Sequence, residues 1–458
     1  MKRTLLAGGL VGVFTLLGSG IITNCKSPFW FSPAGPTGID TIARLPRLPM
    51  ITTDPSLVPI LTYPDSASID TSLTPILTWK PVIGALKYRV VLSTNTRFGT
   101  TIIDDSTLTV IDTSKMIPVK LSYSTTYYWA VNAKGDSGKQ GWSSIWPFTT
   151  KMDPFVKLQN DYVAQKFGMF IHFGMSTFAR YPYPTPGGEW ELGGEDENLF
   201  HPESLNLGQW ADVAKSAHCK YVVMTTKHHG GFCLWPSQGP WSLGHPHSIA
   251  QSSWYTQHGQ RDILREFVDS VRSRGMEPGF YFSIWDRTNP AIIAMVKGEL
   301  TELLSNYGDI KVIWFDGWGW RVGYAVIPYD TVANLVHKLN DSLHHHTIIS
   351  ENNHRFKLYN TEIVQYEIPL DGPPLAGNTL PSEGNEPLRG DDCWFWHPMN
   401  STLKSTQFVI NRIKAANAVN ATYLLDVTPD TFGLIPQDQV QSMHDIGVAA
   451  VQQGVLQP

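Results

Sequence analysis

A chain of 458 residues is long enough for two or three domains. Hydrophobic residues make up 42% of it, a proportion that favours large cores and argues against global disorder. The formal net charge of −5 supplies no long-range attraction for nucleic acid, so we expect no nucleic-acid partner. The chain also contains 16 Trp, 17 Tyr and 20 Phe, and rings this frequent suit stacking on sugars as well as core packing.

Residues 1–25 have the pattern of an export signal. A basic start precedes a short apolar run, Leu5–Leu17, which is too short to predict a membrane span. The run leads to Cys25, and the arrangement resembles a bacterial lipoprotein signal, although Asn24 replaces the usual small residue. We expect an exported protein with a lipid anchor on Cys25 or, without that anchor, a periplasmic or secreted one.

The region that follows divides into two segments. Residues 26–56 are rich in Pro, Ser, Thr and Gly, which predicts a linker. Residues 57–150 contain short alternating runs separated by turn residues, a pattern that predicts a small all-β sandwich. The segment resembles a fibronectin type III module, with Trp79 on an early strand and Tyr127 and Trp129 on a late one. Such a module is expected to act as a spacer.

From residue 151 to the C-terminus, strand-like and helix-like segments alternate. Seven strands are predicted, at Gly168–Phe173, Tyr221–Thr226, Gly279–Ile284, Val312–Phe315, Thr347–Ser350, Glu362–Tyr366 and Thr422–Asp426. Between them lie amphipathic segments such as 261–274, whose apolar residues share one helical face. This alternation predicts a (β/α)8-like TIM barrel over residues 151–458, and hence a multidomain protein. The rival, an open doubly wound sheet, would need a Gly-rich nucleotide-binding turn that the sequence lacks.

The cysteines give no sign of a cross-linked framework. Cys219, Cys233 and Cys393 remain after the signal, and their odd number and wide spacing fit neither disulfides nor a zinc site. We expect buried thiols.

Polar side chains follow four of the predicted strands, where barrels of this type build their active sites. They are His172, His228, His229, Trp285 and Asp316. Asp316 is the most informative, because it ends an apolar strand where a lone carboxylate needs partners or a role. If the strands share one barrel, these five side chains meet at one mouth.

Two chemistries fit such a mouth. Imidazoles and a carboxylate could bind a metal, but no short chelating pair such as His-Glu-x-x-His is present. Alternatively, the histidines hold sugar hydroxyls while two carboxylates, roughly 5–5.5 Å apart, break a glycosidic bond with retention. Asp316 would be one of them, and a later strand end or loop must supply the other.

Several stretches, taken in order, resemble the α-L-fucosidases of glycoside hydrolase family 29. They are Lys166–Gly174, Gly188–Trp190, Lys220–Ser237, Gly279–Asn289, Leu303–Gly317, Trp394–His397 and Tyr423–Pro436. The strings K-H-H-x-G-F-x-L-W-P-S and W-F-D-G carry most of the resemblance, which covers most of residues 154–440. Residues 283–287 and 393–397 look more like the subgroup that is selective for α-1,3/1,4-linked fucose.

The resemblance implies roles for individual residues. Asp316 matches the nucleophile, and His172, His228 and His229 match the histidines that hold fucose hydroxyls. The other substrate-binding residues that it implies are Glu189, Trp190, Tyr281, Trp285, Arg389 and Trp394. The implied protein is a retaining α-L-fucosidase that acts on fucosylated oligosaccharides or glycoconjugates without a metal or organic cofactor.

The acid/base residue must be chosen among three glutamates. Glu383 is the first choice, with Glu386 and Glu367 as alternatives. Residues 370–390 are rich in Gly and Pro, which predicts a mobile loop at this place.

Two other functions compete with the enzyme. Gly230 stands where the family often has Asp, and this departure motivates a catalytically impaired lipoprotein that only binds fucosylated glycans. The third hypothesis is a metal-dependent hydrolase. The sequence does not define an oligomeric state.

Overall fold

The structure, a computed structural model, describes residues 54–179, 190–239, 247–288, 293–354, 361–399 and 401–457. The predicted export signal with Cys25, almost all of the predicted linker and Glu189 lie outside these ranges. Across the described ranges, no helix combines the length and the apolar character needed to cross a bilayer.

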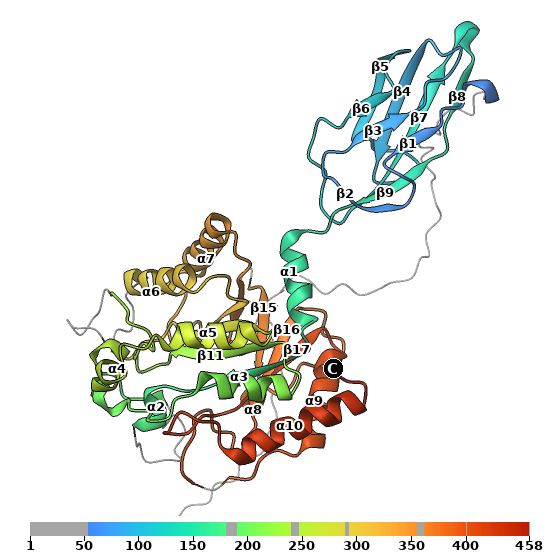
Figure 1. Cartoon of the computed structure of the whole chain (residues 1–458). Coiled ribbons are helices and arrows are strands. Elements are labelled where there is room, and N and C mark those ends of the chain that lie inside the picture. The colour runs from blue at the N-terminus through green and yellow to red at the C-terminus, as the bar shows by residue number, and fades with distance from the viewer. Residues whose placement is uncertain are drawn as a thin grey trace, which may run out of the picture. The chain divides into compact units, whose positions relative to one another are not determined.

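The N-terminal region is built from short strands in two sheets (Figure 1). The strands are β1 (Leu61–Tyr63), β2 (Ser68–Thr71), β3 (Ile76–Trp79), β4 (Lys87–Ser93), β5 (Ile103–Thr109), β6 (Ser114–Met116), β7 (Thr126–Lys134), β8 (Gln140–Trp142) and β9 (Trp146–Thr150). One sheet has the order β1-β3-β6, and the other has the order β2-β9-β7-β4-β5 with β8 against β7. Trp79, Tyr88 and Trp129 are buried, as expected of an all-β sandwich with alternating faces.

Eight parallel strands close into a barrel in the second part of the chain. They are β10 (Phe167–Ile171), β11 (Tyr221–Lys227), β12 (Glu277–Ser283), β13 (Val312–Asp316), β14 (Ile348–Glu351), β15 (Ile363–Glu367), β16 (Ser382–Pro387) and β17 (Ala421–Asp426). The barrel closes because β10 pairs with both β11 and β17. The predicted (β/α)8 fold is therefore confirmed.

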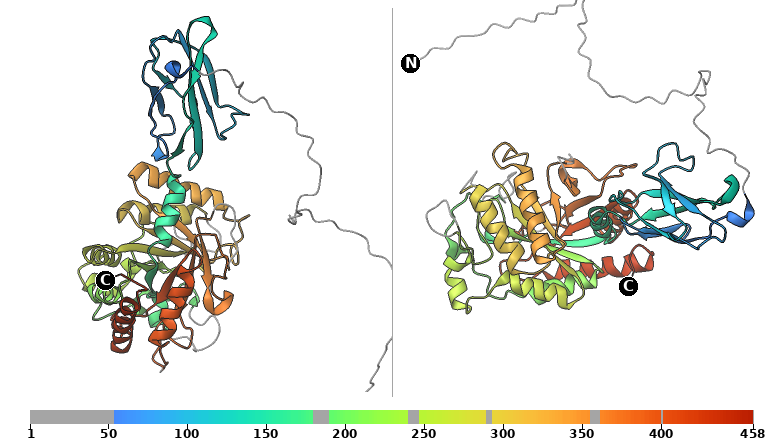
Figure 2. Two further views of the ribbon diagram at one scale, coloured as in Figure 1. Left: turned by 90° about the vertical axis from the view of Figure 1, so that its right-hand side faces the viewer. Right: turned by 90° about the horizontal axis from the view of Figure 1, so that it is seen from above.

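Helices surround the barrel strands (Figure 2). They are α1 (Pro154–Val163), α2 (Met175–Phe178), α3 (Leu207–Ser216), α4 (Ser253–Gln257), α5 (Ile263–Ser273), α6 (Ile293–Asn306), α7 (Tyr329–Leu343), α8 (Ile368–Asp371), α9 (Thr406–Asn417) and α10 (Gln437–Gln452). Helix α5 illustrates why they form. The Asp262 side chain caps its first turn by accepting a hydrogen bond from the Arg265 amide, and its apolar stripe is buried.

Strand β16, which is not among the seven strands predicted from the sequence, corrects the prediction of a mobile loop over residues 370–390. Its sequence, Ser-Glu-Gly-Asn-Glu-Pro, has no apolar residue that would indicate a strand, yet all six residues are buried. Glu383 and Asn385 face the barrel interior, where both bond to Gln365. Glu386 faces outward, accepts from the Tyr423 hydroxyl and forms an ion pair with Arg412. Polar partners on both faces replace the hydrophobic pattern on which strand prediction depends.

Cys219, Cys233 and Cys393 are buried free thiols, as the sequence predicts.

Candidate active site

A cavity of about 340 Å³ opens at the carboxyl ends of the barrel strands. Its lining is aromatic and polar: Phe170, His172, Trp190, His228, His229, Tyr281, Trp314, Asp316, Trp320, Asn352, His354, Glu367, Pro369, Leu370, Asn385, Asp392 and Trp394. Of the residues expected at one mouth, the structure brings together Asp316, His172, His228 and His229. A cavity of this size and composition suits one pyranose unit.

Asp316 is the last residue of β13 and is held by four donors. Its Oδ2 accepts from the Tyr281 hydroxyl at 2.8 Å. Its Oδ1 accepts from the Gly317 amide at 2.7 Å, from Asn352 Nδ2 at 3.2 Å and from Trp320 Nε1 at 3.3 Å. These donors fix the direction of a carboxylate that is only 8% exposed. The residue is thus positioned as a rigid anionic group at the cavity wall.

His229 presents an unprotonated ring nitrogen to the cavity. The Ser283 hydroxyl donates to the Trp285 carbonyl, so the hydrogen bond of 2.7 Å between Ser283 Oγ and His229 Nδ1 has the imidazole as donor. Burial lowers the pKa of His229 to about 4, so its Nε2 carries no proton at neutral pH. That nitrogen lies 3.6 Å from Asp316 Oδ2 and can accept from a sugar hydroxyl.

His172 is oriented by Asp426, a residue that the sequence analysis did not assign to the site. Asp426 ends β17, and its Oδ1 lies 2.9 Å from His172 Nδ1 and accepts from the His172 amide. His172 Nε2 is therefore left for a ligand. The signal that could have found Asp426 is its place at a strand end, which it shares with Asp316.

Three buried polar atoms of the lining lack a hydrogen-bond partner within the described part of the chain. They are His228 Nδ1, Asn352 Oδ1 and Asn385 Oδ1. Burial lowers the pKa of His228 well below its ordinary value, so the ring is neutral and can both donate and accept. A ligand with several hydroxyls would satisfy such a surface better than an apolar one would.

Glu367 is the second carboxylate of the cavity. It ends β15, and its Oε2 accepts from Asn352 Nδ2 at 2.9 Å. The same nitrogen donates to Asp316 Oδ1 at 3.2 Å. The two oxygen atoms can therefore lie no farther apart than the sum of these lengths, about 6 Å, which is below the separation of roughly 6.5–9.5 Å that inverting glycosidases need.

The structure does not bring Glu383, the first choice for the acid/base, to the cavity. It is the second residue of β16 and fully buried below the cavity floor. Its carboxylate accepts from the hydroxyls of Tyr162 and Tyr221, from Trp314 Nε1 and from Gln365 Nε2. A carboxylate surrounded by four donors in the barrel interior cannot reach a ligand in the cavity. The structure therefore does not support Glu383 as the acid/base.

Other predicted residues also lie away from the cavity. Glu386 points outward toward α9, where Arg412 Nε lies 2.8 Å from it in an ion pair. Trp285 stands behind the lining, with its ring 4.9 Å from that of His229. Trp190, Tyr281 and Trp394 line the cavity as expected, whereas Glu189 lies outside the described residues.

Arg389 anchors a loop instead of lining the cavity. Its Nη2 donates to Asp391 at 3.0 Å, to His397 Nε2 at 3.0 Å and to the Met399 carbonyl. Asp391, Cys393 and His397 have ligand atoms within 4.8 Å of one another, which is the spacing of a metal site. The guanidinium already supplies the positive charge there, so a metal ion would have to displace it.

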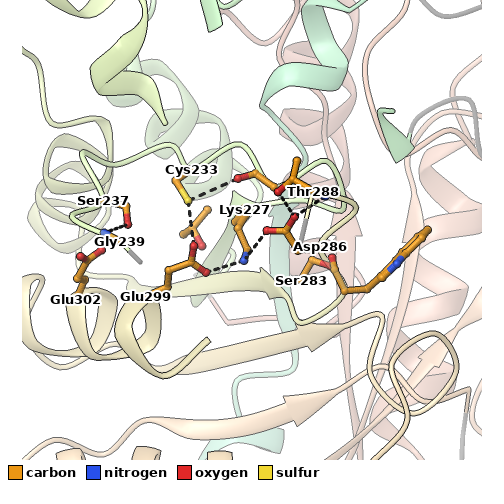
Figure 3. A network of polar contacts seen from close by, with 12 residues as sticks. Lys227, Cys233, Ser237, Gly239, Ser283, Asp286, Thr288, Glu299 and Glu302 are labelled. Carbon is orange, nitrogen blue, oxygen red and sulfur yellow. Dashed lines mark hydrogen bonds and ion pairs between the residues drawn. The ribbon is translucent and has the colours of Figure 1, made fainter. Parts of the chain in front are cut away.

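A buried ion-pair network supports the loops that carry the histidines. Figure 3 shows Lys227, at the end of β11, between Glu299 of α6 and Asp286 of the Trp285 loop. Its Nζ lies 2.6 Å from Glu299 and 3.3 Å from Asp286, and none of the three is more than 2% exposed in its side chain. Burial alone would lower the Lys227 pKa, but the two carboxylates raise it above its ordinary value. Lys227 is therefore charged and joins three elements.

Replacing Lys227 with methionine should destabilise the protein strongly, because two buried carboxylates lose their counter-charge. We expect the free energy of unfolding to fall by about 3–5 kcal/mol. Urea denaturation of the full chain measures this value. The control is Lys297→Met on the exposed face of α6, the helix that carries Glu299, which should change the free energy of unfolding by no more than about 0.5 kcal/mol. Equal effects of the two substitutions would contradict the role of the network.

The space beside Gly230 is filled by the carboxyl group of Glu191. A Cβ at position 230 would lie 1.9 Å from Glu191 Oε2 and 2.6 Å from Glu191 Cβ. Glu191 accepts from the amide and hydroxyl of Ser176, and burial together with the nearby charge of Glu195 raises its pKa to about 8. The departure of Gly230 from the family pattern is therefore accompanied by an acidic group from a different loop.

Introducing alanine at position 230 should reduce activity, because Glu191 must move and the adjacent His228 and His229 must move with it. On an aryl α-L-fucoside, the substrate type that the sequence resemblance implies, we expect kcat/KM to fall about tenfold or more, with about 1–3 kcal/mol lost in stability. Steady-state kinetics and urea denaturation measure the two effects. The matched control is Gly323→Ala, since a Cβ there meets nothing within 4 Å. Wild-type kinetics in Gly230→Ala would refute the tight contact.

The closed parallel barrel and its cavity, lined by carboxylates and buried histidines, define the class of (β/α)8 proteins that carry a pocket at the carboxyl end of the sheet. A family model described as alpha-L-fucosidase matches residues 189–450, more than half of the chain. The chain therefore belongs to the α-L-fucosidase family, glycoside hydrolase family 29, and the resemblance seen in the sequence is confirmed at this level.

Individual relatives agree with this assignment. Alpha-L-fucosidase 1 of Arabidopsis thaliana is 28% identical over 308 residues, covering 60% of this chain and 56% of that protein. A solved glycoside hydrolase 29 family member from an unknown rumen bacterium has a TM-score of 0.51 at 26% identity and covers 64% of this chain and 56% of that one. An alpha-L-fucosidase structure from Bacteroides thetaiotaomicron, with a TM-score of 0.54, 22% identity and coverage of 66% and 74%, shares the fold. The chain spans a little over half the length of the curated relatives that it matches first.

Proposed function

We propose that this protein is a retaining α-L-fucosidase that hydrolyses terminal α-L-fucosyl units of oligosaccharides or glycoconjugates. The observation that carries the proposal is the placement of Asp316 and Glu367 on either side of one amide, Asn352 Nδ2. Membership of the family supports the choice of fucose, and a 22%-identical structural neighbour from Bacteroides thetaiotaomicron is described as a trapped covalent intermediate with 2-fluoro-fucosyl fluoride.

In the proposed first step, Asp316 attacks the anomeric carbon while Glu367 donates a proton to the departing glycosidic oxygen. The bond from the anomeric carbon to Asp316 forms as the glycosidic bond breaks. In the second step Glu367 deprotonates a water molecule, which displaces Asp316 and regenerates the carboxylate. Two displacements at one carbon retain its configuration. Neutral His228 and His229 bind ring hydroxyls, and no step requires a metal.

The finer features of the proposal concern substrate and location. Residues 283–287 and 393–397 support a preference for α-1,3/1,4-linked fucose, and the residue 1–25 pattern supports export with an anchor on Cys25. The N-terminal sheets would then be a fibronectin type III-like spacer. Gly230 motivates the binding-only alternative, because Glu191, which fills the space beside it, is buried and does not line the cavity.

The test is a set of linkage-defined α-L-fucosyl oligosaccharides followed by NMR. We expect free fucose to appear first as the α-anomer, before mutarotation, with the fastest release from α-1,3/1,4 linkages. Chelator treatment should leave the rate unchanged. Release of the β-anomer first would refute retention, and binding without release of fucose would favour the glycan-binding alternative.

A further inference from the structure

Three tryptophans surround one arginine at the lip of the cavity. The Arg321 guanidinium carbon lies 4.8 Å from the ring centroid of Trp190, 4.9 Å from that of Trp320 and 5.0 Å from that of Trp285. The three indoles also contact one another, with centroids 5.8–6.3 Å apart. We call Trp190, Trp285 and Trp320 the tryptophan cage. Each ring attracts the cation through its quadrupole, so the guanidinium is held in one place although Arg321 is exposed.

The tryptophan cage lies where the aglycone would leave the site. Trp190 and Trp320 line the cavity, and Trp320 Nε1 donates to Asp316 Oδ1. The floor of the cavity is closed by buried residues, among them His172 and His228, whereas His229 lies beside the cage, with its ring centroid 4.9–6.1 Å from those of the three tryptophans. A fucosyl unit bound against that floor can connect to the rest of a glycan only past the lip. The sugar that carries the fucosyl unit therefore passes close to Arg321.

The charge of Arg321 has no counter-charge among the residues that the structure describes. No described carboxylate lies within ion-pair distance of it, whereas the exposed Asp392 on the same cavity lip is paired with Lys404 at 2.6 Å. A second cation, Arg287, lies 5.7 Å from the Trp285 ring. Two cations thus lie beside the tryptophan cage, and a guanidinium can bind a planar or tetrahedral anion through its N–H groups.

We propose that Arg321, held by the tryptophan cage, binds an anionic substituent on the sugar to which the fucosyl unit is attached. The inference rests on the proposed α-L-fucosidase function and extends it to a class of substrate, fucosylated glycans with a carboxylate or a sulfate ester on the aglycone. A guanidinium can form two parallel hydrogen bonds with either group. Because the cage already orders the side chain, little conformational entropy is lost on binding.

A purely structural role predicts a different result. If Arg321 only covered the indoles, its loss would shift Trp320 and affect all fucosides to the same extent. An anion site predicts a selective loss instead, confined to anionic substrates and weakened by salt.

The experiment uses the full chain and three substrates with one fucosyl linkage: a neutral oligosaccharide, the same compound with a sulfate ester on the aglycone, and a version with a carboxylate-bearing aglycone sugar. We expect wild-type kcat/KM to be about tenfold or more higher on at least one anionic substrate than on the neutral one. Arg321→Gln should abolish this ratio and keep aryl α-L-fucoside hydrolysis within about twofold of wild type. Arg321→Lys keeps the positive charge but lacks the two parallel N–H donors of the guanidinium, so it should retain part of the preference for the anionic substrate. The favoured anion identifies the natural substituent.

The matched control is Lys338→Gln, which removes one exposed positive charge from α7 and should keep the full ratio. Addition of 0.5 M NaCl should lower the ratio in wild type but not in Arg321→Gln. A wild-type ratio near one on both anions, or an equal loss on all three substrates in Arg321→Gln, would overturn the inference. If wild type fails to hydrolyse even the aryl α-L-fucoside, the proposed function itself fails, so the two failures are distinguishable.

Discussion

Replacing Asp316 with glycine is expected to lower kcat on an aryl α-L-fucoside about 10³-fold or more. The reason is that no other carboxylate can replace it as nucleophile: Glu367 lies on the other side of Asn352, and Glu383 is sealed by four donors in the barrel interior. The measurement is the initial rate of aryl release, with the circular dichroism spectrum as a check of the fold.

Sodium azide supplies an internal control for Asp316→Gly. Azide can enter the space left by the carboxylate and attack from the same face, so the variant should form β-L-fucosyl azide from an activated α-L-fucoside. The product configuration therefore reports which face Asp316 occupied. Activity of Asp316→Gly within tenfold of wild type, or formation of the α-azide, would show that another residue is the nucleophile.

The barrel could be predicted because most of its strands carry the usual pattern. In β13, Val312 to Phe315 are apolar and buried, and the chain places Asp316 directly after them. Because parallel strands end at the same rim, the sequence order alone was sufficient to bring His172, His228, His229 and Asp316 together. This part of the site follows from local pattern plus topology.

The sequence left three glutamates open as the acid/base, and it could not rank them because β16, the strand that carries Glu383 and Glu386, is polar. Periodicity cannot recognise β16, whose carboxylates are satisfied by residues from α1, β11, β13, β15, β17 and α9. The sequence alone does not distinguish a glutamate in a loop from a glutamate in such a strand. Asp426 and Asn352 were missed for a related reason, since each acts through a contact with a residue at the end of the neighbouring strand. The residues in each contact are far apart in the sequence, so a local sequence pattern cannot predict the contact.

Replacing Glu367 with glutamine should have a large effect that depends on the leaving group. Glu367 is the only carboxylate besides Asp316 and Asp392 in the described cavity lining, and Asp392 is paired with Lys404 at the exposed lip. For an oligosaccharide, whose departing oxygen needs a proton, we expect kcat/KM to fall about 10²–10⁴-fold. For an aryl fucoside with an acidic phenol, the first step should be much less affected. The slope of log kcat/KM against the phenol pKa measures this dependence, and it should be steeper in Glu367→Gln than in wild type.

Glu383→Gln is the matched comparison, because it makes the same change sixteen positions along the chain. Tyr162, Tyr221, Trp314 and Gln365 all donate to Glu383, so an amide there leaves at least one donor facing another donor. We expect a loss of about 1–3 kcal/mol in stability and an unchanged leaving-group slope. Azide should accelerate turnover of Glu367→Ala and give a product of retained anomeric configuration, because an anionic nucleophile needs no general base. Azide should not change the turnover of Glu383→Gln. A steep slope in Glu383→Gln together with a wild-type slope in Glu367→Gln would assign proton transfer to the buried residue, which would require the barrel floor to open during catalysis.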